Sequence, residues 1–346
     1  MFLTEKEILD TPAALAKTCA LFEEQKEAIA AFFAAHPQRK FTFFGCGSSY
    51  MLSKSAATLF AAQPDTCASA IPAGDYIVNP AFWKETVKNS IIVTVSRSGK
   101  TSEMVRAVRH IVDNYGCPVI SLSMKDDNDI MPMSGLDLTM DWCYDNSVCQ
   151  TRTVTNLYAA ILLLAAAYSG DSRLAASVRA AAAENEAFQA KYRPVLEQIA
   201  ALDWQNVTVL ADGPVCGIAE EASLAFTEIA MLTGRYFRLL DYRHGPVVIS
   251  DRHTLTLMLL SPGDEALQGD MVRDVLAHGG PLVTVSAKAE NLYGATAHVQ
   301  IAGIEDFAAW GIPFVYLSQM TALLKSIAQG GNPDAPTGLD AYITLK

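Results

Sequence analysis

A set of short apolar segments occurs twice along the chain with nearly the same spacing. The first set is 41–44, 91–95, 118–123 and 136–140, and the second set is 207–210, 255–260, 281–286 and 298–301. The first three starts are separated by 50 and 27 residues in one half and by 48 and 26 in the other. Most of the segments are apolar on both faces, as in strands of a parallel sheet that helices cover. The matched spacing predicts two copies of one structural unit.

Helical stretches such as 102–115 and 271–278 lie between these segments, and alternating strands and helices indicate an α/β fold. We therefore predict two units, each a mainly parallel sheet with helices on both faces, a three-layer αβα arrangement. The length of 346 residues agrees with about two domains. The predicted division is a helical segment 1–35, a first unit 36–170, a helical connector 171–202, a second unit 203–330 and a tail 331–346.

Two short patterns predict where the N-terminal helices begin. Thr4 and Glu7 have the spacing of a capping box, and Pro12 after Thr11 suits the first turn of a second helix. Further on, the run 157–168 is apolar and rich in alanine. It is shorter than the roughly twenty residues that cross a bilayer, so it predicts a buried helix and no membrane span.

The charge and the cysteines narrow the class of protein. The net charge of −11 argues against a nucleic-acid-binding protein, which needs a basic surface. Seven scattered cysteines, with no Cys-x-x-Cys, predict reduced thiols in a cytoplasmic protein. Charged residues in the first ten positions do not fit a signal peptide. Six histidines form no close pair, so we predict no metal site.

The first candidate for chemistry is the sequence Gly-Cys-Gly-Ser-Ser at 45–49, directly after an apolar segment. Glycines allow a tight turn, and Ser48 and Ser49 would begin a helix whose free amides favour an anion. The simpler alternative is a strand-to-helix turn with a capping serine. The third glycine of a dinucleotide fingerprint and the Gly-Lys-Ser/Thr of a P-loop are both missing, so NAD and ATP are not predicted.

The second candidate is the loop 96–103, Ser-Arg-Ser-Gly-Lys-Thr-Ser-Glu, which follows the segment 91–95. Ser96, Ser98 and Thr101 place three hydroxyls around Gly99. Such a loop can hold a phosphate with hydroxyls and helix-terminal amides. A polar loop with a capping serine is the alternative interpretation.

Together these motifs resemble the double-SIS (sugar isomerase) family. The motifs that carry the resemblance are 45–49, 96–103, Glu221 to Glu228, Asp241 to Pro246 with its His-Gly-Pro, and Asn332-Pro333-Asp334. They follow in the family's order and extend from about residue 5 to 334. The nearest type is the tagatose-6-phosphate ketose/aldose isomerase, also described as a galactosamine-6-phosphate deaminase/isomerase. The isomerase half of glutamine–fructose-6-phosphate transaminase and the fructosamine-6-phosphate deglycases are also near.

The resemblance implies a set of site residues. Its substrate and phosphate contacts would be Ser48, Ser49, Ser96, Ser98, Gly99, Thr101, Val148 and Gln150. Gln150 replaces the family's serine, and Arg152 replaces its lysine. Glu228 would be the general base, and His244, which assists ring opening, would come from a neighbouring subunit. We therefore expect a homodimer or a higher homo-oligomer with shared active sites.

The chemistry of these residues agrees with that assignment. Conversion of an aldose to a ketose moves a proton between C1 and C2, and a carboxylate such as Glu228 can carry it. The sequence neighbours of Glu228 are apolar, which indicates a buried carboxyl, and burial would raise its pKa. The alternative is an exposed carboxylate, which is the usual state of a single glutamate on a helix. Glu221 lies two helical turns before Glu228 on the same face. It would act as a second acid/base or would support the structure of the site. Ring opening needs a group that can transfer a proton, a role for which a histidine such as His244 is suited. The alternative is that His244 is a turn residue.

Two departures from the family limit the predicted chemistry. Ala341 stands where the transaminase relatives have a Schiff-base lysine, and Lys346 is five residues away, so we predict no cofactor and no Schiff base. In the second unit, Ser261 to Asp264 replaces the hydroxyl-rich loop and brings a carboxylate. We therefore expect the first unit alone to bind the sugar phosphate.

The sequence thus predicts a sugar-phosphate isomerase/deaminase that acts through an enediol-type proton transfer. A fructosamine-6-phosphate deglycase is the alternative within the enzymes, because it would use the same base. A sugar-phosphate sensor without catalysis is the alternative of another class. The segment before the first unit is short and not basic, which disfavours a DNA-binding module.

Overall fold

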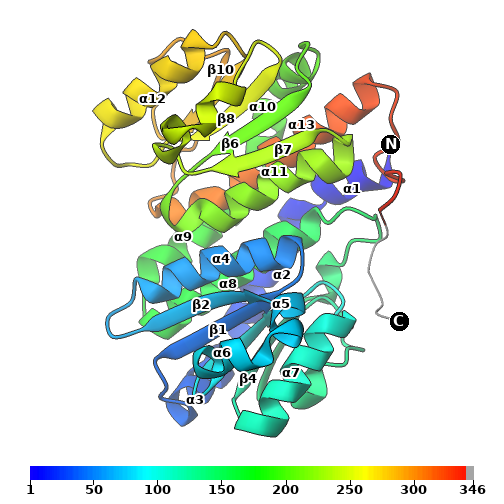
Figure 1. Cartoon of the computed structure of the whole chain (residues 1–346), viewed down its shortest axis with the longest axis vertical. Coiled ribbons are helices and arrows are strands. Elements are labelled where there is room, and N and C mark those ends of the chain that lie inside the picture. The colour runs from blue at the N-terminus through cyan, green and yellow to red at the C-terminus, as the bar shows by residue number, and fades with distance from the viewer. Residues whose placement is uncertain (340–346) are drawn as a thin grey trace.

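The computed structural model describes residues 1–339 and contains two parallel five-stranded sheets (Figure 1). The first is made of β1 Lys40–Gly45, β2 Cys67–Pro72, β3 Ile91–Val95, β4 Val119–Ser123 and β5 Leu136–Thr139. The second is made of β6 Asn206–Leu210, β7 Thr233–Phe237, β8 Thr254–Leu259, β9 Leu282–Ser286 and β10 Ala297–Gln300. Their orders are β2-β1-β3-β4-β5 and β7-β6-β8-β9-β10. The two sheets therefore share one topology, and the predicted repeat is confirmed.

The sequence prediction missed one strand in each sheet, β2 and β7. Both are edge strands, paired on one side only, to β1 and β6 respectively. Their residues are mostly half-buried, whereas β1, β3 and β4 are almost fully buried. An edge strand need not be apolar throughout, and the mixed sequences of β2 and β7 did not reveal them, although the opposite edge strands β5 and β10 were predicted.

Helices cover both faces of the first sheet, as predicted for a three-layer unit. One face carries α3 Lys26–Ala35, α4 Ser48–Ala61 and α8 Arg152–Ser169. The other carries α5 Ala73–Val78, α6 Pro80–Val87 and α7 Ser102–Tyr115, which pack around Phe44 and Ile92. The predicted helix 102–115 has the bounds of α7, and the apolar run 157–168 lies in α8, which is buried along nearly its whole length.

The second sheet is covered in the same way. On one face lie α10 Asn185–Ala200, α11 Cys216–Ala230 and α13 Gly311–Ala328. The other face carries α12 Glu265–Ala277, whose Met271, Val272 and Val275 enter the core. This helix begins six residues before the predicted start of 271, because the carboxylate of Asp264 accepts a hydrogen bond from the amide of Leu267 and caps it.

The connecting segments are helical. The N-terminal segment forms α1 Leu3–Leu9, α2 Thr11–Glu24 and α3, with Pro12 in the first turn of α2. The stretch between the sheets forms α9 Ser172–Ala183 and α10. We interpreted it as packing on both sheets, but α9 packs on helices α2 and α8, whereas α10 contacts β10. One described helical stretch, Phe307–Ala328, is apolar and long enough to cross a membrane, and 89% of it is buried within the protein.

The predicted capping box at Thr4 and Glu7 does not form. Thr4 lies inside α1, and its amide and hydroxyl donate to the carboxylate of Asp334. Glu7 turns instead toward the loop before α8, where the amide of Asn146 donates to it. A short helix with a tertiary partner at each end does not need the local cap.

The two units meet through α4 and α11, which lie side by side at the middle of the molecule (Figure 1). Thr58 contacts Cys216, the hydroxyl of Ser55 accepts from the amide of Gly217, and Lys54 pairs with Glu220 at 2.7 Å. The residue numbers fall along one helix as they rise along the other, so the helices are antiparallel. This direction carries the C-terminal half of α11 past the start of α4.

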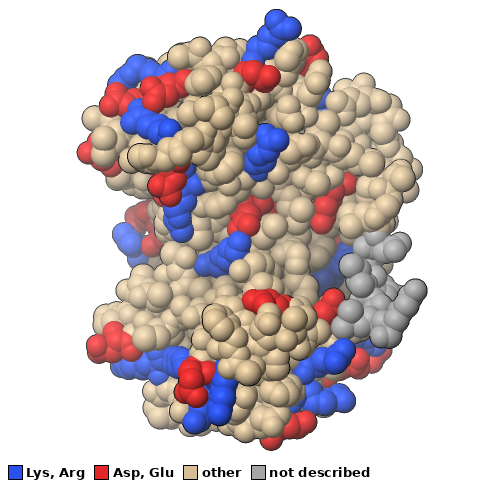
Figure 2. All heavy atoms as spheres, viewed as in Figure 1, with Lys and Arg blue, Asp and Glu red and all other residues tan. Residues whose placement is uncertain are grey.

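Charges of both signs are interspersed on the face shown in Figure 2. Lysine and arginine side chains stand next to aspartate and glutamate over both units, and no continuous basic field covers this face. The described residues include ion pairs between such charges, for example Arg243 with Asp274 and Lys288 with Glu265.

Candidate functional site

The hydroxyl-rich loop follows β3 at the carboxyl edge of the first sheet. The hydroxyl of Ser96 accepts from the amide of Gly99 at 3.0 Å, and that of Ser98 accepts from the amide of Lys100 at 3.1 Å. A serine hydroxyl that accepts one bond still has its own hydrogen to donate. Thr101 precedes α7, and its side chain makes no capping bond. The loop thus offers hydroxyls and the first amides of α7 to an anion.

Gly99 is required for the shape of this loop. Its φ angle is +61°, and a Cβ atom there would lie 2.5 Å from the Cβ of Asn128. The amide of Asp129 also donates to the carbonyl of Gly99. The loop after β4 therefore supports the loop after β3, and a larger residue at 99 would push the two apart.

The turn 45–49 connects β1 to α4 next to this loop. A Cβ on Gly45 would lie 2.3 Å from the backbone of Ser49, so the turn closes only with glycine. Gly47 has a φ of +53° and stands directly before α4. Ser48 and Ser49 occupy the first turn of α4 and are both buried. The loops after β1 and β3 are neighbours because β1 pairs with β3, at the position where doubly wound sheets bind ligands.

Two carboxyl groups reach this edge from α11 of the second unit. Glu221 is 1% exposed and hydrogen-bonds to Ser48, whereas Glu228 is half-buried. Glu228 lies seven residues, or two helical turns of about 10 Å, beyond Glu221. Since α11 runs antiparallel to α4, this distance carries Glu228 past the start of α4, toward Arg97 of the hydroxyl-rich loop.

Burial shifts the proton affinity of both groups. It raises the pKa of Glu228 to about 7, against a smaller lowering by the positive charge of Arg97. It raises the pKa of Glu221 well above its usual range, with the nearby charge of Glu228 acting in the same direction and the bond from Ser48 opposing it. A carboxyl with a pKa near neutrality can both take and return a proton at physiological pH.

The loop 145–151, between β5 and α8, closes the site from another side. The guanidinium of Arg97, 6% exposed, donates to the carbonyls of Ser147 at 3.0 Å and Val148 at 3.4 Å. The side-chain oxygens of Gln150 and Thr151 are buried without a hydrogen-bond partner. Buried polar atoms are normally paired, so these two atoms suit the hydroxyls of a polar ligand.

The structure brings most of the predicted residues to one edge but does not join His244 to them. His244 is exposed in the short 3₁₀ helix Asp241–His244, which follows β7 in the second unit. Within residues 1–339 no hydrogen bond or ion pair connects it to Glu228 or Glu221. Ala341 and Lys346 lie outside the described residues.

Some residues of the site were missed as site residues by sequence reasoning. Arg97 lies in the loop 96–103, and Cys149 and Thr151 flank the predicted contact Gln150, yet no local pattern distinguishes them from neighbouring loop residues. Cys149 is 1% exposed, and burial raises the pKa of its thiol to about 12. The nearby charges of Glu228 and Glu221 act in the same direction. Glu7, 139 residues before Asn146, has no sequence signal that links it to the loop.

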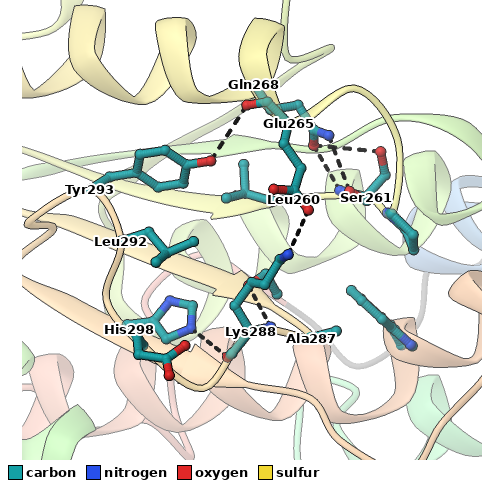
Figure 3. A pocket seen from close by; sticks show the side chains of 13 residues that line it. Leu260, Ser261, Glu265, Gln268, Ala287, Lys288, Leu292, Tyr293 and His298 are labelled. Carbon is teal, nitrogen blue, oxygen red and sulfur yellow. Dashed lines mark hydrogen bonds and ion pairs between the residues drawn. The ribbon is translucent and has the colours of Figure 1, made fainter.

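The second unit has a pocket at the same edge of its own sheet (Figure 3). Its lining residues include Leu260, Gln268, Leu292, Tyr293 and Trp310. The polar groups in it are paired with one another. Lys288 forms an ion pair with Glu265 at 2.7 Å, and Gln268 exchanges hydrogen bonds with the backbone of Ser261 (Figure 3). The carboxylate of Asp264 occupies the N-terminus of α12, where a phosphate would compete with it.

All seven cysteines are free thiols. Within the described part of the chain, no group of three or more His, Cys, Asp or Glu side chains could hold a metal ion. The candidate site consists of side-chain hydroxyls, backbone amides, carboxyl groups and one arginine.

The fold and the site define a double α/β protein, in which one unit presents hydroxyls and helix-terminal amides at one edge and the other unit brings carboxyl groups to it. Residues 36–167 match the family model of the SIS domain, so the first unit of this chain is a SIS domain. Its second unit repeats the topology of the first.

Curated relatives match nearly the whole chain. The D-galactosamine-6-phosphate deaminase AgaS of Escherichia coli is 22% identical, over 96% of this chain and 91% of that protein. The protein of the same name from Shewanella sp. (strain ANA-3) is 25% identical, over 97% and 88%. A glutamine–fructose-6-phosphate aminotransferase of Legionella pneumophila (strain Paris) is 24% identical, over 75% of this chain and 44% of that protein.

Solved structures share the fold. Tagatose-6-phosphate ketose/aldose isomerase from Escherichia coli superposes with a TM-score of 0.85 at 19% identity, covering 99% of this chain and 97% of that chain. Glucosamine-6-phosphate deaminase from Thermotoga maritima gives a TM-score of 0.80 at 21% identity, covering 99% and 100%. The predicted family and fold class are confirmed.

The buried carboxyl of Glu221 should make stability depend on pH. Its pKa is higher in the folded protein than in the unfolded chain, so the free energy of unfolding falls as pH rises from about 4.5. At pH 8 we expect Glu221→Gln to have a free energy of unfolding about 1–3 kcal/mol higher than that of the wild type, measured by urea unfolding. At pH 4.5 the two should differ little. An unchanged difference between the two pH values would contradict this prediction.

Proposed function

We propose that this protein is a sugar-phosphate isomerase/deaminase that acts on a phosphorylated amino sugar or ketose. The observation that carries the proposal is the placement of Glu228, with a pKa near 7, next to Arg97 of the hydroxyl-rich loop after β3. A phosphate-sized anion site and a proton-transferring base at one edge are what an enediol-type reaction requires. The names of the whole-length relatives agree with this reaction class.

In the proposed reaction, the hydroxyls of Ser96, Ser98 and Thr101 and the amides at the start of α7 hold the phosphate. Ser48, Ser49 and the unpartnered oxygens of Gln150 and Thr151 face the sugar chain. Glu228 takes the proton from C2 of the open-chain amino aldose and returns it to C1, while O1 gains a proton and the amino nitrogen at C2 loses one. The resulting ketose imine adds water and releases ammonia, which leaves the ketose phosphate.

The decisive experiment compares two kinds of substrate. The purified protein is incubated with galactosamine 6-phosphate, and ammonia release is measured; in parallel, amine release is measured from a fructosamine 6-phosphate. We expect ammonia from the amino sugar. Release of amine from the fructosamine phosphate alone would replace the proposal with a deglycase, and tight binding without turnover of either substrate would replace it with a sensor.

The pH dependence of the reaction follows from the pKa of Glu228. A general base must be ionised in the free enzyme, so kcat/KM should rise with pH and level off above a midpoint near 7. The measurement is kcat/KM between pH 5 and 9 with the preferred substrate. A midpoint near 4.5, the ordinary range of a glutamate, would show that the rate-limiting base is not a buried carboxyl.

The exposed position of His244 supports a shared active site. We expect the chain to assemble as a homo-oligomer in which His244 of one copy serves the site of another. Glu228→Gln and His244→Ala, each with low activity, should together recover activity when unfolded and refolded as a mixture. In a dimer, about a quarter of the wild-type activity should return. Failure to recover any activity, although mixed dimers form, would place both residues in one copy.

A further inference from the structure

Glu7 of α1 holds the loop that closes the site. It is 2% exposed, and the amides of Asn146 and Ser147 donate to its carboxylate, the first at 2.7 Å. The hydroxyl of Ser147 also lies against this carboxylate. Hydrogen bonds from amides to a buried carboxylate are stronger than those between neutral groups, so the backbone at 146–147 has a well-defined position.

The same stretch of backbone holds Arg97. The amide of Ser147 faces Glu7, and its carbonyl accepts from the guanidinium of Arg97, as does the carbonyl of Val148. Arg97 in turn acts electrostatically on Glu228. Hydrogen bonds from Glu7 to Arg97 through the backbone at 147–148, followed by the electrostatic action of Arg97 on Glu228, therefore join a helix at the N-terminus to a carboxyl group of the second unit.

The helix that carries Glu7 is itself anchored. The carboxylate of Asp334 accepts from the amides of Leu3 and Thr4 and from the hydroxyl of Thr4. Glu5 forms an ion pair with Arg193 of α10 at 2.8 Å. With both its first turn and one side held, α1 presents Glu7 to the loop in one position. The anchored helix therefore fixes the position of the loop backbone through Glu7.

We propose that Glu7 is a positioning residue of the active site, because it fixes the backbone at 146–148 whose carbonyls hold Arg97 beside Glu228. This inference rests on the proposed role of Glu228 as the base. Glu7 itself does not touch the substrate or the reacting atoms. Its role is to keep the positive charge of Arg97 at the distance where it favours the ionised form of Glu228.

The charged and titratable groups that face Glu228 determine the expected effect. They are Arg97 from the loop after β3, Glu221 from the same helix and the neutral thiol of Cys149 from the loop before α8. Among these groups, all within residues 1–339, only Arg97 carries a positive charge. If its guanidinium moves away, burial alone acts on Glu228, and the midpoint of its titration rises.

The test is Glu7→Gln, with Glu24→Gln at the exposed end of α2 as the matched control. We expect kcat of Glu7→Gln to fall about tenfold or more, since small displacements of catalytic groups are costly. KM should change little because the phosphate-binding hydroxyls are untouched. The midpoint of the acid limb of the pH profile should move to higher pH. Glu24→Gln should retain the wild-type profile. A wild-type kcat and midpoint in Glu7→Gln would overturn the proposal.

Two further measurements separate this inference from simpler explanations. In an Arg97→Lys background, Glu7→Gln should add no further shift of the midpoint, because both changes act through one group. If Glu7→Gln does not fold, Ser147→Ala removes one of the contacts to Glu7 and should give a smaller shift in the same direction. Additive shifts, or no shift in Ser147→Ala, would contradict the proposal.

A readout without turnover distinguishes the failure of this inference from the failure of the proposed function. The titration of the Glu228 carboxyl can be followed by NMR of protein labelled with ¹³C in its glutamate side chains, with Glu228→Gln used for assignment. We expect a midpoint near 7 in the wild type and a higher one in Glu7→Gln. If no sugar phosphate reacts, the proposed function fails, and this shift still decides the role of Glu7.

Discussion

Replacing Glu228 by glutamine is expected to reduce kcat by about a thousandfold, which is the range that a positioned general base contributes. Glutamine has nearly the same volume and keeps the half-buried position, but it cannot accept the proton from C2. Substrate binding should change little, since the phosphate contacts belong to the first unit. The measurement is the steady-state rate with the preferred sugar phosphate, together with its affinity from calorimetry.

The matched control is Glu220→Gln on the same helix. Glu220 pairs with Lys54 on α4 at 2.7 Å, partly exposed to solvent, and lies outside the carboxyl pair that faces the site. This variant should retain most of the activity, because a partly exposed ion pair contributes little stability. If Glu228→Gln retains activity within a few-fold of the wild type, Glu228 is not the base.

Replacing Gly217 by alanine is expected to destabilise the protein by about 3 kcal/mol. A Cβ at this position would lie 2.0 Å from the carbonyl oxygen of Met51 and 2.7 Å from the amide of Ser55. These are backbone atoms of α4 that no side-chain rotation can move, so the two helices must separate. Urea unfolding monitored by circular dichroism measures the loss, and a change of less than about 1 kcal/mol would contradict the close packing.

Gly74→Ala in α5 is the control for this variant. A Cβ on Gly74 would meet no atom within 4 Å, and the helical backbone accepts alanine there. This change should leave stability unchanged or raise it by about 0.5–1 kcal/mol. Gly217→Ala should also lower the activity of the folded fraction, since Glu221 and Glu228 move with α11. Gly74→Ala should not.

Most of the central strands could be predicted because they are buried on both faces and therefore apolar throughout. The edge strands β2 and β7 could not, because half-buried strands have mixed composition and their place depends on pairing with β1 and β6. The start of α12 was missed because Asp264 caps it from a loop that has no apolar periodicity. The Thr4–Glu7 pattern was misleading because both side chains have tertiary partners.

The sequence by itself determined the repeat, the parallel α/β architecture and the loops that carry hydroxyls and glycines. These depend on local order, since burial selects apolar strands and tight turns select glycine. Only the tertiary structure decided that Glu228 meets Arg97 and that Glu7 holds the loop at 146–147. Such contacts join residues more than 130 positions apart, and the antiparallel packing of α4 on α11 creates the first of them. Proton affinity, which depends on burial and neighbouring charge, follows from that packing.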